Sequence, residues 1–280
     1  MKYSVIISAL LLSCSCLCAR EYNCNVVYSP EDSIRCEEIL NRPFSSNIHT
    51  TDIAKLFLNT PYLSGTLDRG NTENVVVRLD SVDCTTFVET VTALTQCRNK
   101  NERNFSDYIK ALENIRYRNG ICNGYTSRLH NFSEWILNNQ EMGIIEEILP
   151  VNLITEELRT INFMSCNSQK YNQITNDIVL SEIKASERVL SSLPFRYIPK
   201  DKVANLTPNI VSEGDIIAIV TDIDGLDISH VGFATFIDGE IHLLHASSGK
   251  NEVIIDPLTL NEYLAKFKHH IGIKILRPLK

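Results

Sequence analysis

A single cysteine stands at the expected start of a helix, within the segment Asp-Cys-Thr-Thr-Phe-Val-Glu at residues 83–89. The apolar residues that follow repeat with the period of one helix face: Phe87, Val88, Val91 and Leu94. Asp83 is a favoured N-cap type, so we expect the Cys84 sulfur at the positive end of a helix dipole. Such a site favours the thiolate, which is the nucleophilic form. The alternative is a buried cysteine that packs as a small apolar side chain.

Two histidines lie further along, in two strand-like runs that flank Asp238-Gly239. This dipeptide is a strong signal for a two-residue hairpin turn. Counting outward from the turn places Gly232 opposite His245 and puts His230 on the same face as His245. His242 has the other parity and faces away. A nucleophile, a base and a group that orients the base form a cysteine hydrolase, so we predict Cys84 as nucleophile, His230 as base and His245 as its orienting partner. Two histidines on a polar sheet edge are the plainer alternative.

The chain resembles a known family of cell-wall enzymes. The cysteine helix, the His-Val-Gly strand and the His-Ala-Ser strand are similar to NlpC-type, papain-like hydrolases. The narrower resemblance is to the N-acetylmuramoyl-L-alanine amidase-like family. It rests on these and four further segments, namely Thr-Pro-Tyr at 60–62 with Gly-Thr-Leu at 65–67, Tyr-Ile-Pro-Lys at 197–200, Gly-Asp-Ile-Ile at 214–217 and Gly-Leu-Asp-Ile-Ser at 225–229.

The resemblance implies three substrate-binding residues and a bond. Tyr62 matches a tyrosine that lines the catalytic groove and can donate its hydroxyl to the oxyanion; a half-buried loop tyrosine is the alternative. Arg128 and His130 match an Arg-x-His segment that suits carboxylates and sugar rings. Asn131 departs from the family pattern, in which an aromatic residue follows the histidine. The implied reaction is hydrolysis of the amide between N-acetylmuramic acid and L-alanine in muropeptides, as part of cell-wall turnover.

Three other functions compete with the amidase. An NlpC-type endopeptidase would cut between D-glutamate and a diamino acid. A catalytically silent protein would only bind the cell wall. A zinc hydrolase would use His230, His242 and His245, but His242 has the wrong parity and no metal-motif spacing occurs, so we expect no metal and no cofactor.

The order of the elements predicts an α+β fold. Helices are expected at 31–41, 50–58, 181–193 and 258–267, with strands at 75–79, 215–220, 230–237, 240–247, 252–255 and 271–276. Helices followed by strands favour an antiparallel sheet, here of the papain-like NlpC type and packed against the cysteine helix. We predict one catalytic domain over residues 20–280, with a helical insertion around 100–195.

The start of the chain predicts export. Residues 1–19 have a lysine, an apolar run and small residues near Cys16, Cys18 and Ala19, as in a signal peptide. Leu-Leu-Ser-Cys at 11–14 also resembles a lipobox, which would add a lipid anchor at Cys14. We therefore expect an exported bacterial protein, either periplasmic or a membrane-anchored lipoprotein.

Composition limits the partners. The net charge of −7 and the absence of a Lys/Arg block exclude nucleic acid as an expected partner, and no protein partner is evident. Muropeptides are the expected binding partner. Export permits disulfides, of which Cys24–Cys36 is the easiest pair to propose and Cys97–Cys122 is possible.

Overall fold

The structure is a computed structural model that describes residues 24–44 and 48–279. The described α-helices are α1 Pro30–Asn41, α2 Thr50–Ala54, α3 Cys84–Asn99, α4 Phe105–Arg116, α5 Phe132–Glu141, α6 Phe163–Cys166, α7 Asp177–Ser192 and α8 Leu260–Lys266. The described strands are β1 Val26–Val27, β2 Val75–Val76, β3 Ile145–Ile148, β4 Thr155–Glu157, β5 Phe195–Pro199, β6 Ile216–Thr221, β7 Ile228–Ile237, β8 Glu240–Ser247, β9 Glu252–Thr259 and β10 His270–Pro278. The predicted signal segment at residues 1–19 lies outside the described residues.

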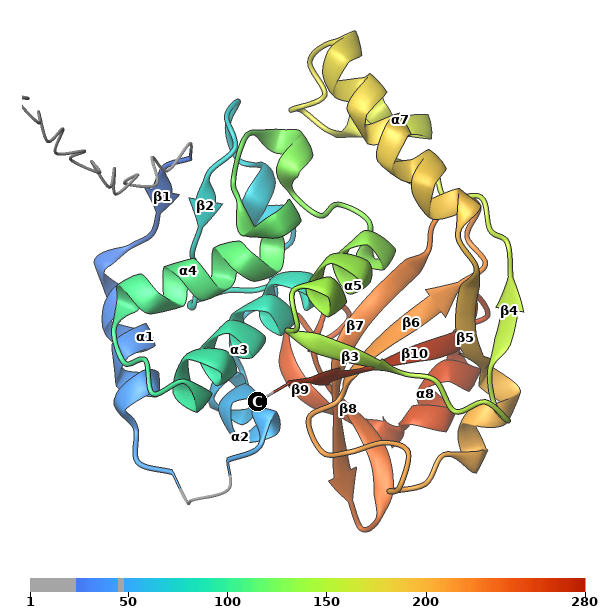
Figure 1. The fold of residues 1–280 in the computed structure, drawn as a ribbon. Coiled ribbons are helices and arrows are strands. Elements are labelled where there is room, and N and C mark those ends of the chain that lie inside the picture. Colours follow the sequence, from blue (N-terminus) through green and yellow to red (C-terminus); the bar gives the residue numbers. More distant parts are fainter. Residues whose placement is uncertain (1–23, 45–47, 280) are drawn as a thin grey trace, which may run out of the picture.

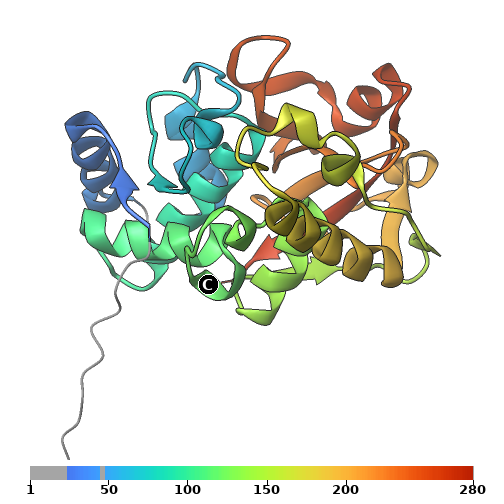
Figure 2. The same ribbon diagram turned by 90° about the horizontal axis from the view of Figure 1, so that it is seen from above.

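The fold is α+β with an antiparallel main sheet, as predicted. Its strands run in the order β4-β5-β10-β6-β7-β8-β9, and β3 also pairs with β10. Helices α1 to α5 gather on one side of the molecule and the sheet on the other (Figure 1). In the view from above, α7 crosses the front of the sheet (Figure 2). All strands of this sheet, from β3 to β10, lie in the second half of the chain.

Helix α3 packs against one face of the sheet, which positions Cys84 next to the hairpin. Its Phe87 ring lies 5.6 Å from the Phe233 ring of β7, edge to face. The same apolar cluster includes Val91 and Leu244, all fully buried. The opposite face of the sheet forms a second cluster with α8, through Leu260 and Leu264. The burial of apolar area on both faces holds the strands between two helical layers.

The hairpin forms with the predicted turn. Asp238 and Gly239 both have positive φ, at 51° and 87°, as a two-residue turn of the primed type requires. The pairing then runs from Ile237 opposite Glu240 to Phe233 opposite Leu244. The register is therefore the predicted one along the paired part of the two strands.

Two expectations differ from the structure. The segment around 100–195 is not only helical, because β3 and β4 leave it and join the sheet. The disulfide joins Cys24 to Cys122, so both predicted pairings, Cys24–Cys36 and Cys97–Cys122, are wrong. The parallel pairing of β1 with β2 brings Cys24 to the part of the helical layer that holds Cys122, a long-range contact that spacing does not reveal.

The remaining described cysteines are free: Cys36 and Cys97 are buried, Cys84 is partly exposed and Cys166 is exposed. Among the helices of the described residues, none has both the length and the apolar character needed to span a membrane.

Candidate active site

Cys84 is the first residue of α3, and Asp83 caps the helix. The Asp83 carboxylate accepts a hydrogen bond from the Thr86 N–H at 2.8 Å, and the Thr86 hydroxyl accepts one from the Asp83 N–H at 2.9 Å. This reciprocal capping box fixes the first turn, and it confirms the prediction that Asp83 is the N-cap. The cap leaves the N–H groups at the very start of the helix free to face a ligand.

The pKa of the Cys84 thiol is raised, whereas the helix-start position predicts a stabilised thiolate. Burial raises the pKa of the thiol to about 11, and the neighbouring Asp83 carboxylate adds to the shift. Hydrogen bonds from the Val231 N–H and from Thr85 lower the pKa again, but by less. The cap that forms the helix start thus places a negative charge beside the sulfur, which sequence reasoning from the helix dipole did not include. The thiol is therefore the resting form of Cys84.

His230 and His245 lie in contact. His230 Nε2 is 2.6 Å from His245 Nδ1, and the two rings are nearly perpendicular, with centroids 4.8 Å apart. Gly232 makes this possible, since a Cβ there would lie 2.8 Å from the His245 Cβ. A bulge at Ser229, where β7 pairs with β6, directly precedes His230. Such bulges change the direction of neighbouring side chains, and this one lies next to His230.

Both imidazoles are neutral at neutral pH. Burial lowers the pKa of His230 to about 3, helped by the charges of His245 and His270. Burial also lowers the pKa of His245 to about 4, against the opposing effect of Asp256. A neutral imidazole near a thiol has the chemistry of a general base, because it has an unprotonated nitrogen that can accept a proton.

Asp256 lies behind His245 and was not predicted. Its Oδ2 is 3.5 Å from His245 Nε2, and its side chain is 13% exposed against 1% for His245. The predicted strand ended at 255, whereas β9 continues to Thr259 through a bulge. Because Asp256 stands two residues after Ile254, the partner of His245, strand parity places it on the face of His245. A longer strand assignment would have found this residue.

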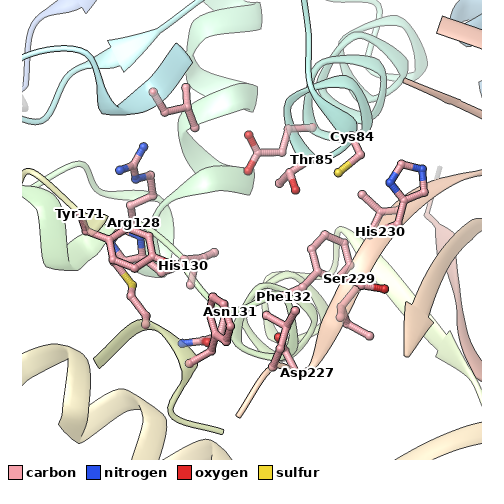
Figure 3. Close-up of a pocket in the computed structure, with 18 of the residues that line it drawn as sticks. Cys84, Thr85, Arg128, His130, Asn131, Phe132, Tyr171, Asp227, Ser229 and His230 are labelled. Carbon is pink, nitrogen blue, oxygen red and sulfur yellow. The ribbon is translucent and has the colours of Figure 1, made fainter. Parts of the chain in front are cut away.

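A cavity of about 270 Å³ opens in front of Cys84 and His230. Its wall comes from the helical layer, from the segment around α6 and from the start of β7. Figure 3 shows the Cys84 side chain and the His230 imidazole near each other on one side of this cavity, with Arg128 and His130 on the other. Thr85, Asn131, Tyr171, Asp227 and Ser229 also line it and had no predicted role. His245 and Tyr62 are not among the lining residues.

Tyr62 lies near Cys84. A β-bridge to Val82 holds it in place, and its N–H donates to the Asn251 carbonyl at 2.8 Å. Burial and the charge of Cys84 raise the pKa of the Tyr62 phenol to about 12, so its hydroxyl stays a hydrogen-bond donor.

Arg128 lines the cavity but is already paired. Its guanidinium forms an ion pair with Asp68 and lies 3.6 Å from the Glu73 carboxylate, and its side chain is only 6% exposed. It also lies over the Tyr125 ring, at 5.0 Å from the centroid. The pairing with two carboxylates makes Arg128 a different kind of group from the free carboxylate clamp that the resemblance implies.

His130 is fixed in one tautomer. One of its ring nitrogens, Nε2, is 2.8 Å from the Tyr125 carbonyl oxygen, which can only accept, so Nε2 carries the proton. Burial and the Arg128 charge lower the pKa of His130 to about 3. It therefore offers Nδ1 as a neutral hydrogen-bond acceptor.

His242 lies apart from the other two histidines, as its parity predicts. Its Nδ1 donates to the Asp256 carbonyl at 3.0 Å. Within the part of the chain that the structure describes, no group of three or more His, Cys, Asp or Glu side chains is arranged to hold a metal ion.

The chain was compared with known protein families and structures. Residues 52–273 match the N-acetylmuramoyl-L-alanine amidase-like family. An N-acetylmuramoyl-L-alanine amidase from Bacteroides uniformis ATCC 8492 is 34% identical, with a TM-score of 0.78 over 82% of this chain and 98% of that one. A Bacteroides fragilis protein whose name proposes a xylanase is 36% identical, with a TM-score of 0.74 over 81% and 99%.

A Legionella pneumophila protein shares the fold at 21% identity, with a TM-score of 0.63 over 89% of this chain and 94% of that one. A search of curated proteins found no significant match. The family match covers most of the sequence and includes Cys84, His230 and His245. This chain therefore belongs to the N-acetylmuramoyl-L-alanine amidase-like family.

Proposed function

We propose that this protein is a cysteine-dependent amidase that hydrolyses the bond between N-acetylmuramic acid and L-alanine in peptidoglycan fragments. The observation that carries the proposal is the arrangement of Cys84 at a helix start, near a neutral His230 (Figure 3) that His245 contacts at 2.6 Å. These are the nucleophile, base and orienting group of a cysteine hydrolase, in the manner of papain-like NlpC enzymes. Family membership supplies the substrate class.

The reaction begins from a neutral pair. The Cys84 thiol has a raised pKa and His230 a lowered one, so the proton stays on sulfur until a carbonyl carbon is in place. As the sulfur attacks, His230 takes the proton, and the imidazolium that forms contacts His245. His245 is neutral, so it accepts a hydrogen bond from His230 and spreads the developing charge.

The developing oxyanion is stabilised at the helix start. The Cys84 N–H is a free donor of the first turn, and the helix dipole favours negative charge there. The Tyr62 hydroxyl is a candidate second donor, since it lies close to Cys84 and its raised pKa keeps it protonated.

His230 then protonates the leaving amine. Collapse of the tetrahedral intermediate breaks the C–N bond and leaves a thioester on Cys84. His230, neutral again, removes a proton from water, and hydrolysis of the thioester frees the lactyl carboxylate and the thiol.

The cavity supports a substrate that carries a sugar and a peptide. Its wall combines apolar surfaces such as Phe132 and Met164 with polar groups such as Asn131 and Asp227. Because Arg128 already pairs with Asp68 and Glu73, we assign it to shaping the cavity, with Nδ1 of His130 as a free acceptor for a sugar or peptide N–H.

The endopeptidase and the silent wall-binding protein remain the alternatives. An endopeptidase would use the same three residues on a different amide, so only the products separate it from the amidase. A silent protein would not need a Cys84–His230–His245 arrangement.

A glycosidase needs two free carboxyl groups across the bond. Among the cavity's carboxylates, Asp68 pairs with Arg128, Glu89 with Arg116 at 2.7 Å, and Asp227 accepts from the Ser133 N–H at 2.6 Å.

The test is digestion of a defined sugar-tetrapeptide, followed by mass spectrometry. We expect intact disaccharide and intact tetrapeptide with a free L-alanine amine, and no cleavage of the free peptide. Cys84→Ala should abolish the reaction, whereas Cys166→Ala removes an exposed free thiol and should leave it unchanged. A product in which L-alanyl-D-glutamate stays joined to the sugar would identify the endopeptidase. Binding without cleavage would identify the silent protein.

We also propose that the protein is exported, with residues 1–19 as the signal and the periplasm or a membrane-anchored lipoprotein as its destination. The Cys24–Cys122 disulfide supports an oxidising compartment. The intact mass of the mature protein distinguishes a cleaved signal from a diacylated Cys14. A mature protein that retains residues 1–19 in the cytoplasm would contradict export.

A further inference from the structure

Asp256 is a partly buried carboxylate that lies near the far nitrogen of His245. His245 Nε2 is enclosed and has no hydrogen-bond partner among the described residues; Asp256 Oδ2 lies 3.5 Å from it, within ion-pair distance. The other oxygen, Oδ1, accepts a hydrogen bond from the Leu258 N–H at 2.9 Å. The Leu258 N–H, in the irregular part of β9, thus holds Oδ1 in place and leaves Oδ2 on the side of His245.

This contact favours one arrangement of the protons on the two rings. A carboxylate only accepts, so it favours the His245 proton on Nε2 and leaves Nδ1 as an acceptor. His245 Nδ1 lies 2.6 Å from His230 Nε2, which must then carry the proton of that ring. The remaining nitrogen of His230, Nδ1, is left unprotonated and can take the proton of Cys84.

We propose that Asp256 is a positioning residue that sets the tautomers of His245 and His230, so that the base nitrogen of His230 is free to accept the Cys84 proton. The proposal rests on the proposed cysteine mechanism, but not on the identity of the bond that is cut. It extends the predicted triad by one residue that touches neither the substrate nor the cysteine.

Other charged and titratable groups around the two histidines do not replace Asp256. Tyr263 of α8 packs edge-on against His245 at 5.5 Å between ring centroids, and its raised phenol pKa keeps it neutral. His270 of β10 stacks on Tyr263 at 5.8 Å, and burial lowers the pKa of His270 to about 4. Cys84 of α3 lies near His230 at the cavity (Figure 3). Asp256 is thus the carboxylate that faces this cluster in the described structure.

Substitution by asparagine gives a sharper test than substitution by alanine. In Asp256→Asn, the Leu258 N–H keeps the amide oxygen at the position of Oδ1, so the amide NH₂ faces His245 Nε2. His245 must then accept at Nε2 and donate from Nδ1, which forces the His230 proton onto Nδ1, facing the thiol. In Asp256→Ala, water can enter and either tautomer remains possible.

We therefore expect the asparagine variant to be the less active of the two. A wrong tautomer in a catalytic triad costs about 10⁴-fold in kcat, so we expect a loss of about 10³-fold for Asp256→Asn and about 10-fold for Asp256→Ala. The loss should fall on kcat rather than KM, since Asp256 does not line the cavity. Asp222→Asn is the matched control, because Asp222 pairs with the exposed His269 at 2.7 Å, and this variant should keep wild-type activity.

Two readouts do not depend on the substrate. Nitrogen-15 NMR of the wild-type imidazoles should show His230 and His245 protonated on Nε2 and bare on Nδ1, and Asp256→Asn should invert both. In a Cys166→Ser background, which removes the exposed free thiol, iodoacetamide should alkylate Cys84 far more slowly in Asp256→Asn than in wild type, over a pH profile from 5 to 9.

The results separate the two proposals. If NMR and alkylation behave as expected but muropeptides are not cut at the L-alanine bond, Asp256 keeps its role and the bond assignment is wrong. A wild-type His230 protonated on Nδ1, or an asparagine variant as active as the alanine variant, would overturn the role of Asp256. Should Asp256→Asn not fold, the wild-type NMR spectrum still decides the question.

Discussion

Three neutral histidines at the candidate active site should make this protein sensitive to mild acid. Burial lowers the pKa of His130 and His230 to about 3 and that of His245 to about 4, from the ordinary histidine value of 6.5. In mildly acidic solution, these histidines therefore bind protons in the unfolded chain but not in the folded protein. Their contribution to stability is fully present above pH 6.5, and it is lost as the pH falls towards 3.

The size of the effect follows from the linkage relation. Between about pH 7.5 and pH 5.5, each such histidine lowers the free energy of unfolding by about 1.4 kcal/mol, or about 4 kcal/mol for all three. Near pH 5.5, each contributes a slope of about 1.2 kcal/mol per pH unit. Glu73 and Glu89, whose carboxyl pKa values are raised by burial, act in the opposite direction, so single-histidine variants are needed to isolate each contribution.

The assay is urea unfolding followed by circular dichroism at half-unit pH steps from 5 to 8.5. His245→Asn and His130→Asn should each flatten the slope near pH 5.5 by about 1.2 kcal/mol per pH unit, and leave it unchanged above pH 7.5, where neither state binds the proton. A wild-type stability that is constant from pH 8 to pH 5, or variants with the wild-type slope, would refute the reasoning. It would mean that the histidines are protonated in the folded protein, and the neutral resting pair of the proposed mechanism would fail with them.

Three further predictions concern the packing at Gly232, a buried ion pair and the disulfide. Gly232→Ala places a Cβ 2.8 Å from the His245 Cβ, so we expect a loss of about 1–3 kcal/mol in unfolding free energy and a displaced imidazole; unchanged kcat would contradict this. Arg116→Met leaves the Glu89 carboxylate buried without its partner at 2.7 Å and should cost about 3–5 kcal/mol, most of which Glu89→Gln should restore in the double variant. Cys122→Ser removes a disulfide that spans 98 residues and should cost about 2–5 kcal/mol; equal thermal midpoints for variant and wild type would argue against it.

The elements governed by local sequence patterns were predictable. The capping residue Asp83 and the apolar period after it fix the start of α3, and Asp238-Gly239 fixes the hairpin turn. Because a hairpin register follows from its turn, the contact of His230 with His245 also follows from sequence. These features depend on residues close together in the chain.

The features that depend on distant residues were not predictable. The Cys24–Cys122 disulfide requires the pairing of β1 with β2, two very short strands. The pairing of Arg128 with Asp68 and Glu73 joins segments that no periodicity connects. The raised pKa of Cys84 depends on how deeply the folded chain encloses the sulfur, which a helix-start motif does not report.

The position of β10 in the middle of the sheet has a consequence for how the sheet is completed. β10 pairs with β6 along one edge and with β5 and β3 along the other, although all three precede it in the sequence. The sheet cannot be completed without residues 270–278, whereas the helical layer with the Cys24–Cys122 link contains only earlier residues. The layer that carries Cys84 is therefore built from earlier residues than the strand that completes the sheet, and the sheet that carries His230 and His245 depends on the last strand of the chain.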